Sequence, residues 1–154
     1  MGDGRTIKVE DRLELLELEG RYARTFDSRD GDAWAGLFTP NGIYRARGTR
    51  PGDRGRYEGR ASLAEFCSNA PFDGIHLLHV PQFTIAGDTA RARVHLRFVG
   101  TFRADGSTVD MIGYYDVAYA RVDGQWFIDH RVTTTLRTGD GPIAAYPPGD
   151  GFDD

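Results

Sequence analysis

Four long stretches in the second half of the chain have the residue pattern of β-strands separated by tight turns. The stretches cover residues 76–85, 90–103, 109–122 and 125–135, and a Gly-Asp or Asp-Gly pair lies in each gap between them. In the second stretch, apolar residues alternate with Arg91, Arg93, His95 and Arg97, so one face is apolar and the other is basic. Consecutive strands on hairpin turns pair antiparallel. This predicts an antiparallel sheet whose basic face meets water or another subunit.

The first half of the chain has the periodicity of helices. Between residues 7 and 29, apolar residues recur at steps of three and four, and the row through Leu13 and Leu16 leads to Asp27. The adjoining row contains Leu15, Leu18, Tyr22 and Phe26.

Shorter elements follow this first helix. We expect a helix at residues 32–38, a strand at 43–47, an exposed Gly- and Arg-rich loop at 48–59 and a third helix beginning at residue 59. Helices followed by a run of strands predict an α+β fold, in which N-terminal helices cover a curved antiparallel sheet that forms a cone.

Length and composition narrow the class of protein. With 154 residues, we expect one domain over residues 1–137 and a C-terminal tail over residues 138–154. The net charge of −4 argues against a nucleic-acid partner. Every apolar run is interrupted well before the ~20 residues of a membrane helix, which argues against a membrane partner. Cys67 is the only cysteine and the N-terminus has no apolar leader, so we expect a cytoplasmic protein without disulfides.

Asp27 is the first candidate for chemistry, because a carboxylate stands where the apolar row predicts a buried residue. The C-terminal end of a helix also disfavours negative charge. The side chain either faces water beside Ser28 and Asp30, or it is buried next to an imidazole. In the second case the two groups would form an acid–base pair.

Three histidines are candidates for such an imidazole. His76 and His79 lie on the same expected strand but face opposite ways, and alternation slightly favours His79 for the interior. His130 shares a face with Trp126 and Ile128 and is either a pocket donor or, as we favour, a structural residue. There is no glycine-rich phosphate loop and no metal-ligand spacing, so neither a metal nor another cofactor is expected.

Two segments resemble the nuclear-transport-factor-2-like (SnoaL-like) family, which includes scytalone dehydratase, ketosteroid isomerase and bile acid 7α-dehydratase. Residues 22–30 are similar to the family's first-helix signature, in which Asp27 matches a catalytic aspartate and Tyr22 a catalytic tyrosine. Residues 76–81 resemble the strand that carries a catalytic histidine. The match falls on His76, which overrules the preference from alternation.

A third segment, residues 123–128 with Arg131, resembles the closing hairpin of the family. Other positions depart from the enzymes named above. Residues that those enzymes use fall here at Ala46, Thr101 and Phe98, and an arginine position falls near Thr135. The resemblance therefore carries over no exact reaction.

The resemblance implies a cofactor-independent lyase, such as a dehydratase, or an isomerase that acts on a small apolar cyclic compound with hydroxyl or keto groups. In this hypothesis His76, oriented by Asp27, removes a proton next to a carbonyl, and Tyr22 hydrogen-bonds the oxygen that becomes negative. The residues expected to line the ligand pocket are Trp34, Tyr44, His79, Phe98, Met111, Tyr115 and His130. A homodimer or homotrimer, formed through the exposed sheet face, is also implied.

Two other classes of function stay open. The same cone would serve as a non-catalytic binder of small ligands, or as an accessory subunit of an oxygenase, if Asp27 or His76 were turned outward or blocked by aromatic packing. A protein–protein scaffold is favoured if the pocket is filled and the arginine face forms a large interface.

Overall fold

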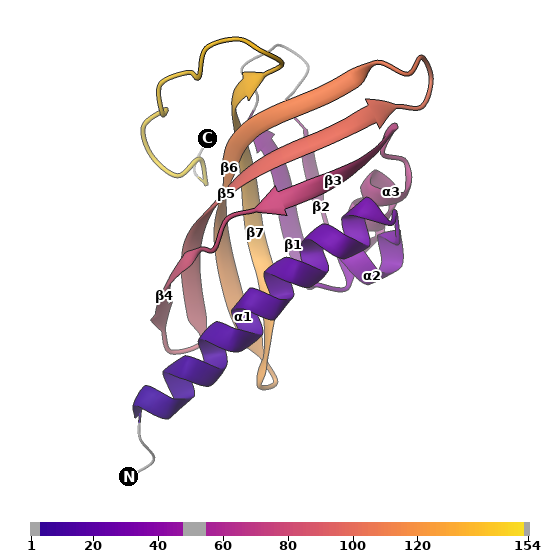
Figure 1. Ribbon diagram of the computed structural model, residues 1–154. Coiled ribbons are helices and arrows are strands. Elements are labelled where there is room, and N and C mark those ends of the chain that lie inside the picture. The colour runs from indigo at the N-terminus through magenta and orange to yellow at the C-terminus, as the bar shows by residue number, and fades with distance from the viewer. Residues whose placement is uncertain (1–3, 48–54, 153–154) are drawn as a thin grey trace.

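The computed structural model describes residues 4–47 and 55–152, and the side chains of all of these except residues 4–7. The described residues form three helices and seven strands (Figure 1). The helices are α1 (Gly4–Asp27), α2 (Gly31–Ala35) and α3 (Arg60–Ser68). The strands are β1 (Phe38–Arg47), β2 (Arg56–Glu58), β3 (Phe72–Leu78), β4 (Gln82–Ala86), β5 (Thr89–Phe102), β6 (Thr108–Val122) and β7 (Gln125–Thr138).

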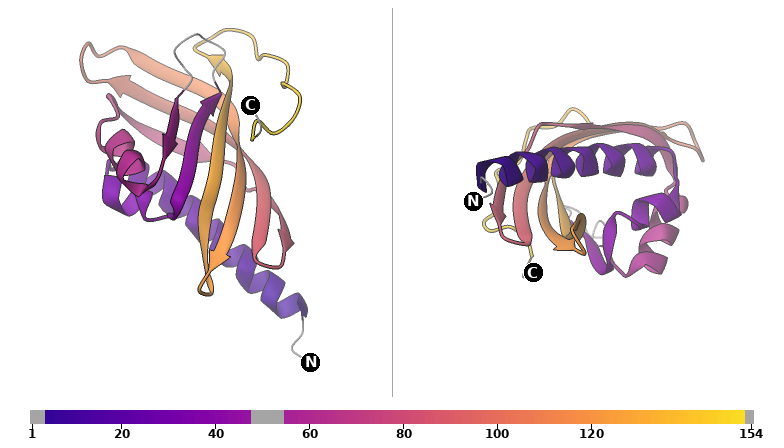
Figure 2. Two further views of the ribbon diagram at one scale, coloured as in Figure 1. Left: turned by 180° about the vertical axis from the view of Figure 1, so that it is seen from behind. Right: turned by 90° about the horizontal axis from the view of Figure 1, so that it is seen from below.

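The strands form one curved sheet in the order β2-β1-β7-β6-β5-β3, and β4 pairs with the first part of β5. Figure 2 shows α1 lying across the sheet, with α2 and α3 at one end. The α+β architecture with a curved sheet and N-terminal helices is therefore confirmed. One pairing differs from the antiparallel expectation, because β1 runs parallel to β7. Among the described residues, no helix is long and apolar enough to cross a membrane.

The face of α1 that packs on the sheet is the second of the two rows seen in the sequence. Leu15, Leu18 and Tyr22 are each at most 1% exposed, whereas Leu13 is 59% and Leu16 is 37% exposed. The buried row carries the two aromatic rings of the helix, Tyr22 and Phe26. Aromatic rings bury more apolar area than leucines, so this row fills the curved sheet better. The expectation that the Leu13 row is buried is wrong.

The predicted strand at residues 76–85 is two strands. β3 begins at Phe72 and ends at Leu78, and β4 begins at Gln82. Pro81 lies between them, and a proline has no N–H to donate to a sheet. Of the predicted loop at 48–59, residues 48–54 lie outside the described residues, while Arg56–Glu58 pair with β1 as β2.

A bulge in β7 changes which of its side chains face the core. Ala118 of β6 pairs with His130, whereas Tyr119 pairs with Ile128, so Asp129 is an extra residue. As a result Ile128 and Arg131, three positions apart, both contact the interior, and His130 contacts the outer face.

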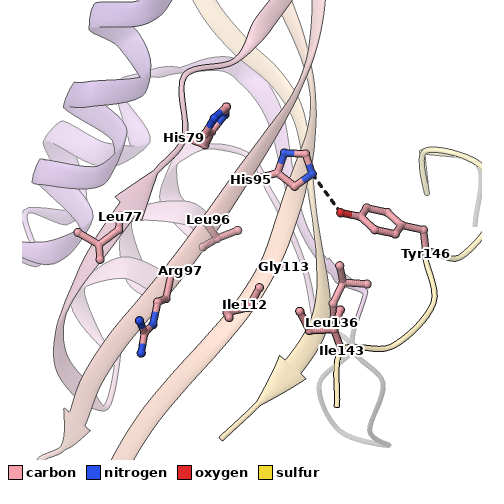
Figure 3. A pocket seen from close by; sticks show the side chains of 10 residues that line it. All are labelled: Leu77, His79, His95, Leu96, Arg97, Ile112, Gly113, Leu136, Ile143 and Tyr146. Carbon is pink, nitrogen blue, oxygen red and sulfur yellow. Dashed lines mark hydrogen bonds between the residues drawn. The ribbon is translucent and has the colours of Figure 1, made fainter. Parts of the chain in front are cut away.

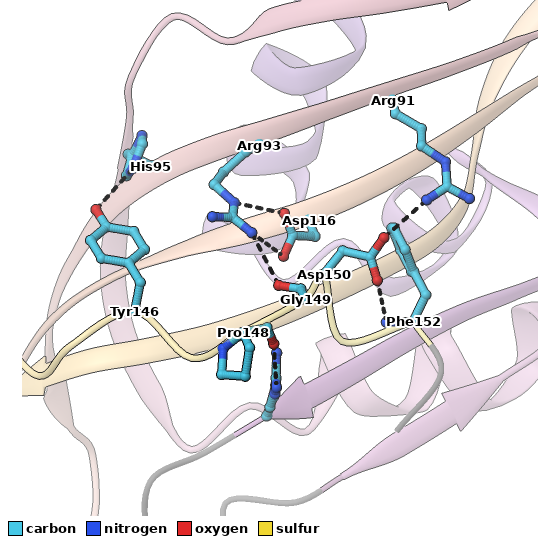
Figure 4. Close-up of polar contacts among 10 residues, drawn as sticks. Arg91, Arg93, His95, Asp116, Tyr146, Pro148, Gly149, Asp150 and Phe152 are labelled. Atoms are coloured by element: carbon cyan, nitrogen blue, oxygen red, sulfur yellow. Dashed lines mark hydrogen bonds and ion pairs between the residues drawn. The ribbon is translucent and has the colours of Figure 1, made fainter.

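Residues 139–152 return over the outer face of the sheet. Tyr146 stacks on Tyr114 with ring centroids 5.3 Å apart and is hydrogen-bonded to His95 (Figure 3). Farther along, Arg91 pairs with Asp150 at 3.1 Å, and the Arg93 guanidinium donates to the carbonyl of residue 149 (Figure 4). The arginine face predicted to meet water or another subunit is thus partly covered by the chain's own C-terminal segment.

Candidate active site

Asp27 and His76 are held together by two hydrogen bonds. The ring Nδ1 of His76 lies 2.6 Å from Asp27 Oδ1, and the backbone N–H of His76 donates to Asp27 Oδ2 at 3.0 Å. The side chains are 7% exposed for His76 and 18% exposed for Asp27. Asp27 is the last residue of α1, where the helix dipole disfavours a carboxylate. The two N–H donors of His76 offset that effect.

This geometry favours one tautomer of the imidazole ring. An ionised carboxylate only accepts hydrogen bonds, so the Nδ1 atom carries the proton that it shares with Asp27. In the neutral ring, Nε2 is then left with its lone pair. Within the described part of the chain, the Asp27 carboxylate is the only hydrogen-bond partner of this ring. Nε2 is therefore free to act as a base.

Aromatic rings surround His76 on several sides. The ring centroid of Phe98 lies 4.7 Å away, that of Phe26 lies 5.3 Å away and that of Tyr22 lies 6.1 Å away. Phe98 is the residue opposite His76 in the β3–β5 register. A Cβ atom on the neighbouring Gly74 would come within 2.4 Å of the Phe98 ring, so glycine is required for this ring to lie where it does. These contacts exclude water from much of the imidazole.

Three buried tyrosines lie together deeper in the fold. Tyr22 and Tyr115 pack edge to face with ring centroids 5.6 Å apart, and Thr133 donates to the Tyr44 hydroxyl at 2.8 Å. Burial raises the pKa of Tyr22 well above its ordinary value, Tyr115 adds to this effect and Arg131 opposes it. Burial likewise raises the pKa of Tyr44 and of Tyr115. All three phenols are protonated at neutral pH and can donate hydrogen bonds.

A buried ion pair lies directly behind these tyrosines. Arg131 donates two hydrogen bonds to Glu19, at 2.8 and 2.9 Å, and its guanidinium lies 3.7 Å from the Tyr22 ring centroid and 3.9 Å from that of Tyr115. Glu19 also accepts a hydrogen bond from Tyr119 at 2.6 Å. Burial lowers the pKa of Arg131, but Glu19, Tyr22 and Tyr115 together raise it above its ordinary value, so the guanidinium stays charged.

Glu19 is absent from the residues predicted for the site, and Arg131 was predicted only as part of the closing hairpin. Glu19 occupies the buried row of α1, one residue after Leu18 and three before Tyr22. A charged residue in that row was a usable signal once the correct row was known. Arg131 was hidden by the bulge at Asp129, because simple alternation places it on the outer face.

Trp34 and Phe66 close the site on the side of α2 and α3. Trp34 packs on Tyr22 at 5.5 Å, and its Nε1–H is buried with no acceptor among the described residues. Phe66 lies 5.8 Å from Phe26 and 5.9 Å from Trp34. The Phe66 ring also lines a hollow of about 440 Å³, whose other lining residues are Tyr57, Ser62, Glu65, Asn69, Ala70 and Pro71. Phe66 thus lines this hollow and also packs on Phe26, one of the rings that contact His76.

The other predicted pocket residues fall into two groups. Trp34, Tyr44, Phe98 and Tyr115 belong to the buried core on the inner side of the sheet, and Met111 packs against it. His79 and His130 do not.

His79 is exposed and lies on the outer side, where its ring is 6.2 Å from that of His95 beside a hollow of about 230 Å³ (Figure 3). His130 packs on Phe152 of the C-terminal segment, with ring centroids 4.9 Å apart. The placement of these two histidines in the pocket is wrong. Strand alternation turns His79 away from the side of His76, and the bulge turns His130 outward.

Comparison with known proteins identifies the family. The family model of the SnoaL-like domain matches residues 8–132. This chain belongs to the SnoaL-like family. The expected resemblance to nuclear-transport-factor-2-like proteins is therefore confirmed. The chain is also 33% identical over 131 residues to Rv2910c, an uncharacterized protein of Mycobacterium tuberculosis, with 82% of this chain and 86% of that protein covered.

Two solved structures have a fold similar to that of this SnoaL-like chain. An NTF2-like protein with a cystatin-like fold from Novosphingobium aromaticivorans has a TM-score of 0.75 at 26% identity, over 92% of this chain and 94% of that chain. The hexachlorocyclohexane dehydrochlorinase LinA-type3 from Novosphingobium barchaimii has a TM-score of 0.76 at 16% identity, over 92% and 97%. The second likeness concerns the fold alone.

Proposed function

We propose that this SnoaL-like protein is a cofactor-independent lyase or isomerase that removes a proton next to a carbonyl group of a small cyclic compound. The observation that carries the proposal is the pair formed by Asp27 and His76. Asp27 fixes the imidazole so that Nε2 is the basic atom, and its negative charge stabilises the imidazolium that forms when Nε2 takes a proton. General base catalysis of this kind typically contributes ~10²–10⁴-fold to a rate.

The tyrosines give the proposal its second component. Loss of the proton leaves negative charge on the carbonyl oxygen, and a protonated phenol that donates to this oxygen stabilises it. Tyr22 is the buried tyrosine whose ring packs against that of His76, and the Tyr115 ring packs edge to face against Tyr22. Arg131, stacked on both rings, holds the two phenols in position. A hydroxyl on the carbon next to the deprotonated one would then leave as water: the His76 imidazolium returns its proton to this oxygen, the C–O bond breaks and a C=C bond forms as the enolate becomes a carbonyl again.

The surroundings support an apolar, ring-containing substrate. Phe26 and Phe98 pack against the base and Trp34 packs against Phe26, and aromatic rings pack well against one another. The hollow beside Phe66 is the route of entry that we propose, because Phe66 lines it and also packs on Phe26, which contacts His76. A dehydrochlorinase has the same fold, which supports an elimination on this scaffold.

The experiment follows proton removal itself, so it needs no knowledge of the natural substrate. 2-Tetralone, a cyclic ketone with acidic α-hydrogens, is incubated with the protein in D₂O, and deuterium incorporation is followed by NMR. We expect the wild-type protein to accelerate exchange and His76→Gln to reduce the acceleration by at least about 100-fold. His95→Gln, which changes a histidine on the outer face, is the matched control and retains full exchange. Equal exchange rates for wild type and His76→Gln would contradict the proposal.

A second candidate function is ligand binding without chemistry. The close packing of Phe26 and Phe98 on the His76 ring favours it, because these rings restrict access to the imidazole. The same experiment separates the two. A binder retains 2-tetralone in equilibrium dialysis but leaves its rate of deuterium exchange unchanged.

A further inference from the structure

The ion pair between Glu19 and Arg131 is not needed for proton transfer, yet both side chains are buried in the interior, with Glu19 3% and Arg131 0% exposed. We propose that Glu19 is a specificity-determining residue: by neutralising Arg131 behind Tyr22 and Tyr115, it makes the site select neutral ketones over carboxylates. This inference rests on the proposed function, since it assumes that ligands bind between His76 and these tyrosines.

The guanidinium of Arg131 is stacked between the faces of Tyr22 and Tyr115, which are the phenols proposed to meet the substrate oxygen. An unpaired arginine at this position would attract a carboxylate, because opposite charges attract strongly where water is excluded. Glu19 engages both terminal nitrogens of the guanidinium in a bidentate pair, which is the strongest arrangement available to it.

The charged groups around the proposed site carry a net negative charge before reaction. Asp27 and Glu19 are carboxylates, Arg131 is a guanidinium and the basic form of His76 is neutral. The remaining ionisable groups in contact with them are protonated phenols with raised pKa values, namely Tyr22, Tyr44, Tyr115 and Tyr119. Two carboxylates and one guanidinium leave one net negative charge.

That charge disfavours an anionic ligand and suits a neutral one. A carboxylate ligand adds a second negative charge to the interior. A neutral ketone adds none, and when its proton moves to His76 the new oxyanion appears together with an imidazolium. Like charges about 10 Å apart at an effective dielectric constant of about 20 repel by an amount that corresponds to roughly a tenfold loss of affinity.

The two unpartnered donors in the interior agree with a neutral, oxygen-bearing ligand. The Nε1–H of Trp34 and the Nε–H of Arg131 are buried and have no acceptor among the described residues. A carbonyl or hydroxyl oxygen is the group that satisfies such a donor without bringing in charge.

The test compares two ligands that have nearly the same shape and differ in charge. 2-Acetylnaphthalene and 2-naphthoate differ by a methyl group in place of a carboxylate oxygen, and their dissociation constants are measured by equilibrium dialysis at pH 7.5. We expect wild type to bind the ketone at least about tenfold more tightly. Glu19→Gln removes one negative charge. We expect it to lower the ratio of the dissociation constant of 2-naphthoate to that of 2-acetylnaphthalene by about tenfold or more. Glu17→Gln, the same change at an exposed position of α1, leaves the ratio unchanged.

Glu19→Gln leaves Arg131 buried without a counter-charge, which destabilises the fold. The double variant Glu19→Gln/Arg131→Met removes both charges and keeps the net charge of the interior. It therefore retains the wild-type preference for the ketone. The inference is overturned if wild type binds both compounds equally, if it binds neither, or if Glu19→Gln weakens both equally while the double variant loses the preference.

These outcomes are distinguishable from failure of the proposed function. Dialysis reports binding without turnover. A protein that prefers the ketone but shows no His76-dependent deuterium exchange retains the charge selection and loses the lyase proposal.

Discussion

Asp27 accepts hydrogen bonds from both the ring and the backbone of the same residue, His76. One oxygen fixes the position of β3 against the end of α1, and the other fixes the protonated nitrogen of the imidazole. A single carboxylate thus couples the packing of a helix on a strand to the chemistry of the base.

Asp27→Asn separates these two effects. An amide has one accepting oxygen, so one of the two N–H groups of His76 loses its acceptor. We expect the free energy of unfolding to fall by about 1–3 kcal/mol and the 2-tetralone exchange rate to fall by about 100-fold or more. Urea unfolding and the exchange assay measure the two quantities. An Asp27→Asn variant that exchanges at the wild-type rate would show that the carboxylate has no part in catalysis.

Tyr22→Phe tests the oxygen-stabilising role. The change keeps the ring packed on Trp34 and Arg131 but removes the buried hydroxyl. We expect exchange to slow by about tenfold to 100-fold, with a loss of stability of about 1 kcal/mol. Tyr146→Phe removes a hydroxyl from the outer face and serves as the control. If both variants exchange at the wild-type rate, the substrate oxygen is stabilised elsewhere.

Cys67 is expected to be unreactive in the folded protein. Burial, followed by the charges of Asp30 and Asp27, raises the pKa of its thiol to about 11. Since the thiolate is the reactive form, modification by a disulfide reagent at pH 8 should be roughly 100-fold slower in native protein than in urea. Labelling rates followed by absorbance measure this. Rapid labelling of native protein would mean that α3 does not protect the thiol.

The sequence predicts the sheet of this fold but not which row of α1 is buried, and the difference has a physical reason. The alternation of apolar and polar residues in β5, with the turns on either side of it, predicts the antiparallel strands correctly. This is because such alternation between two tight turns fits a β-strand and not a helix. The row of α1 that is buried depends on how Tyr22 and Phe26 fit the curved sheet, which is a tertiary property. Spacing alone therefore does not show that the row through Leu13 and Leu16 is the exposed one.

The site shows the same division. Asp27 could be singled out because a carboxylate at the end of an apolar row needs a reason. His76 required the resemblance to the family, since alternation slightly favoured His79. Arg131 could not be placed, because the extra residue Asp129 reverses the alternation of β7, and a bulge leaves no clear sign in one sequence.

His130 predicts a pH dependence of the outer face. Burial lowers its pKa below the ordinary value of 6.5, Arg56 and Arg45 act in the same direction, and Asp129 and Asp150 oppose them. The folded state therefore prefers the neutral ring. The contribution to stability is present above pH 6.5 and is lost as the pH falls below that value towards the folded-state pKa.

We expect this loss to disappear in His130→Gln. Urea unfolding at pH 7.5 and at pH 5.5 should show a larger decrease for wild type than for the variant, because only wild type gains a charge under Phe152. Equal decreases for the two proteins would show that this histidine titrates alike in the folded and unfolded states.

The protonation of the His76 ring tests the central claim most directly, and long-range ¹H–¹⁵N NMR of histidine-labelled protein measures it without any ligand. We predict that neutral His76 carries its proton on Nδ1 with Nε2 unprotonated, and that Asp27→Asn shifts the ring towards the other tautomer. A neutral ring protonated on Nε2 in the wild type, or one that does not respond to Asp27→Asn, would contradict the claim.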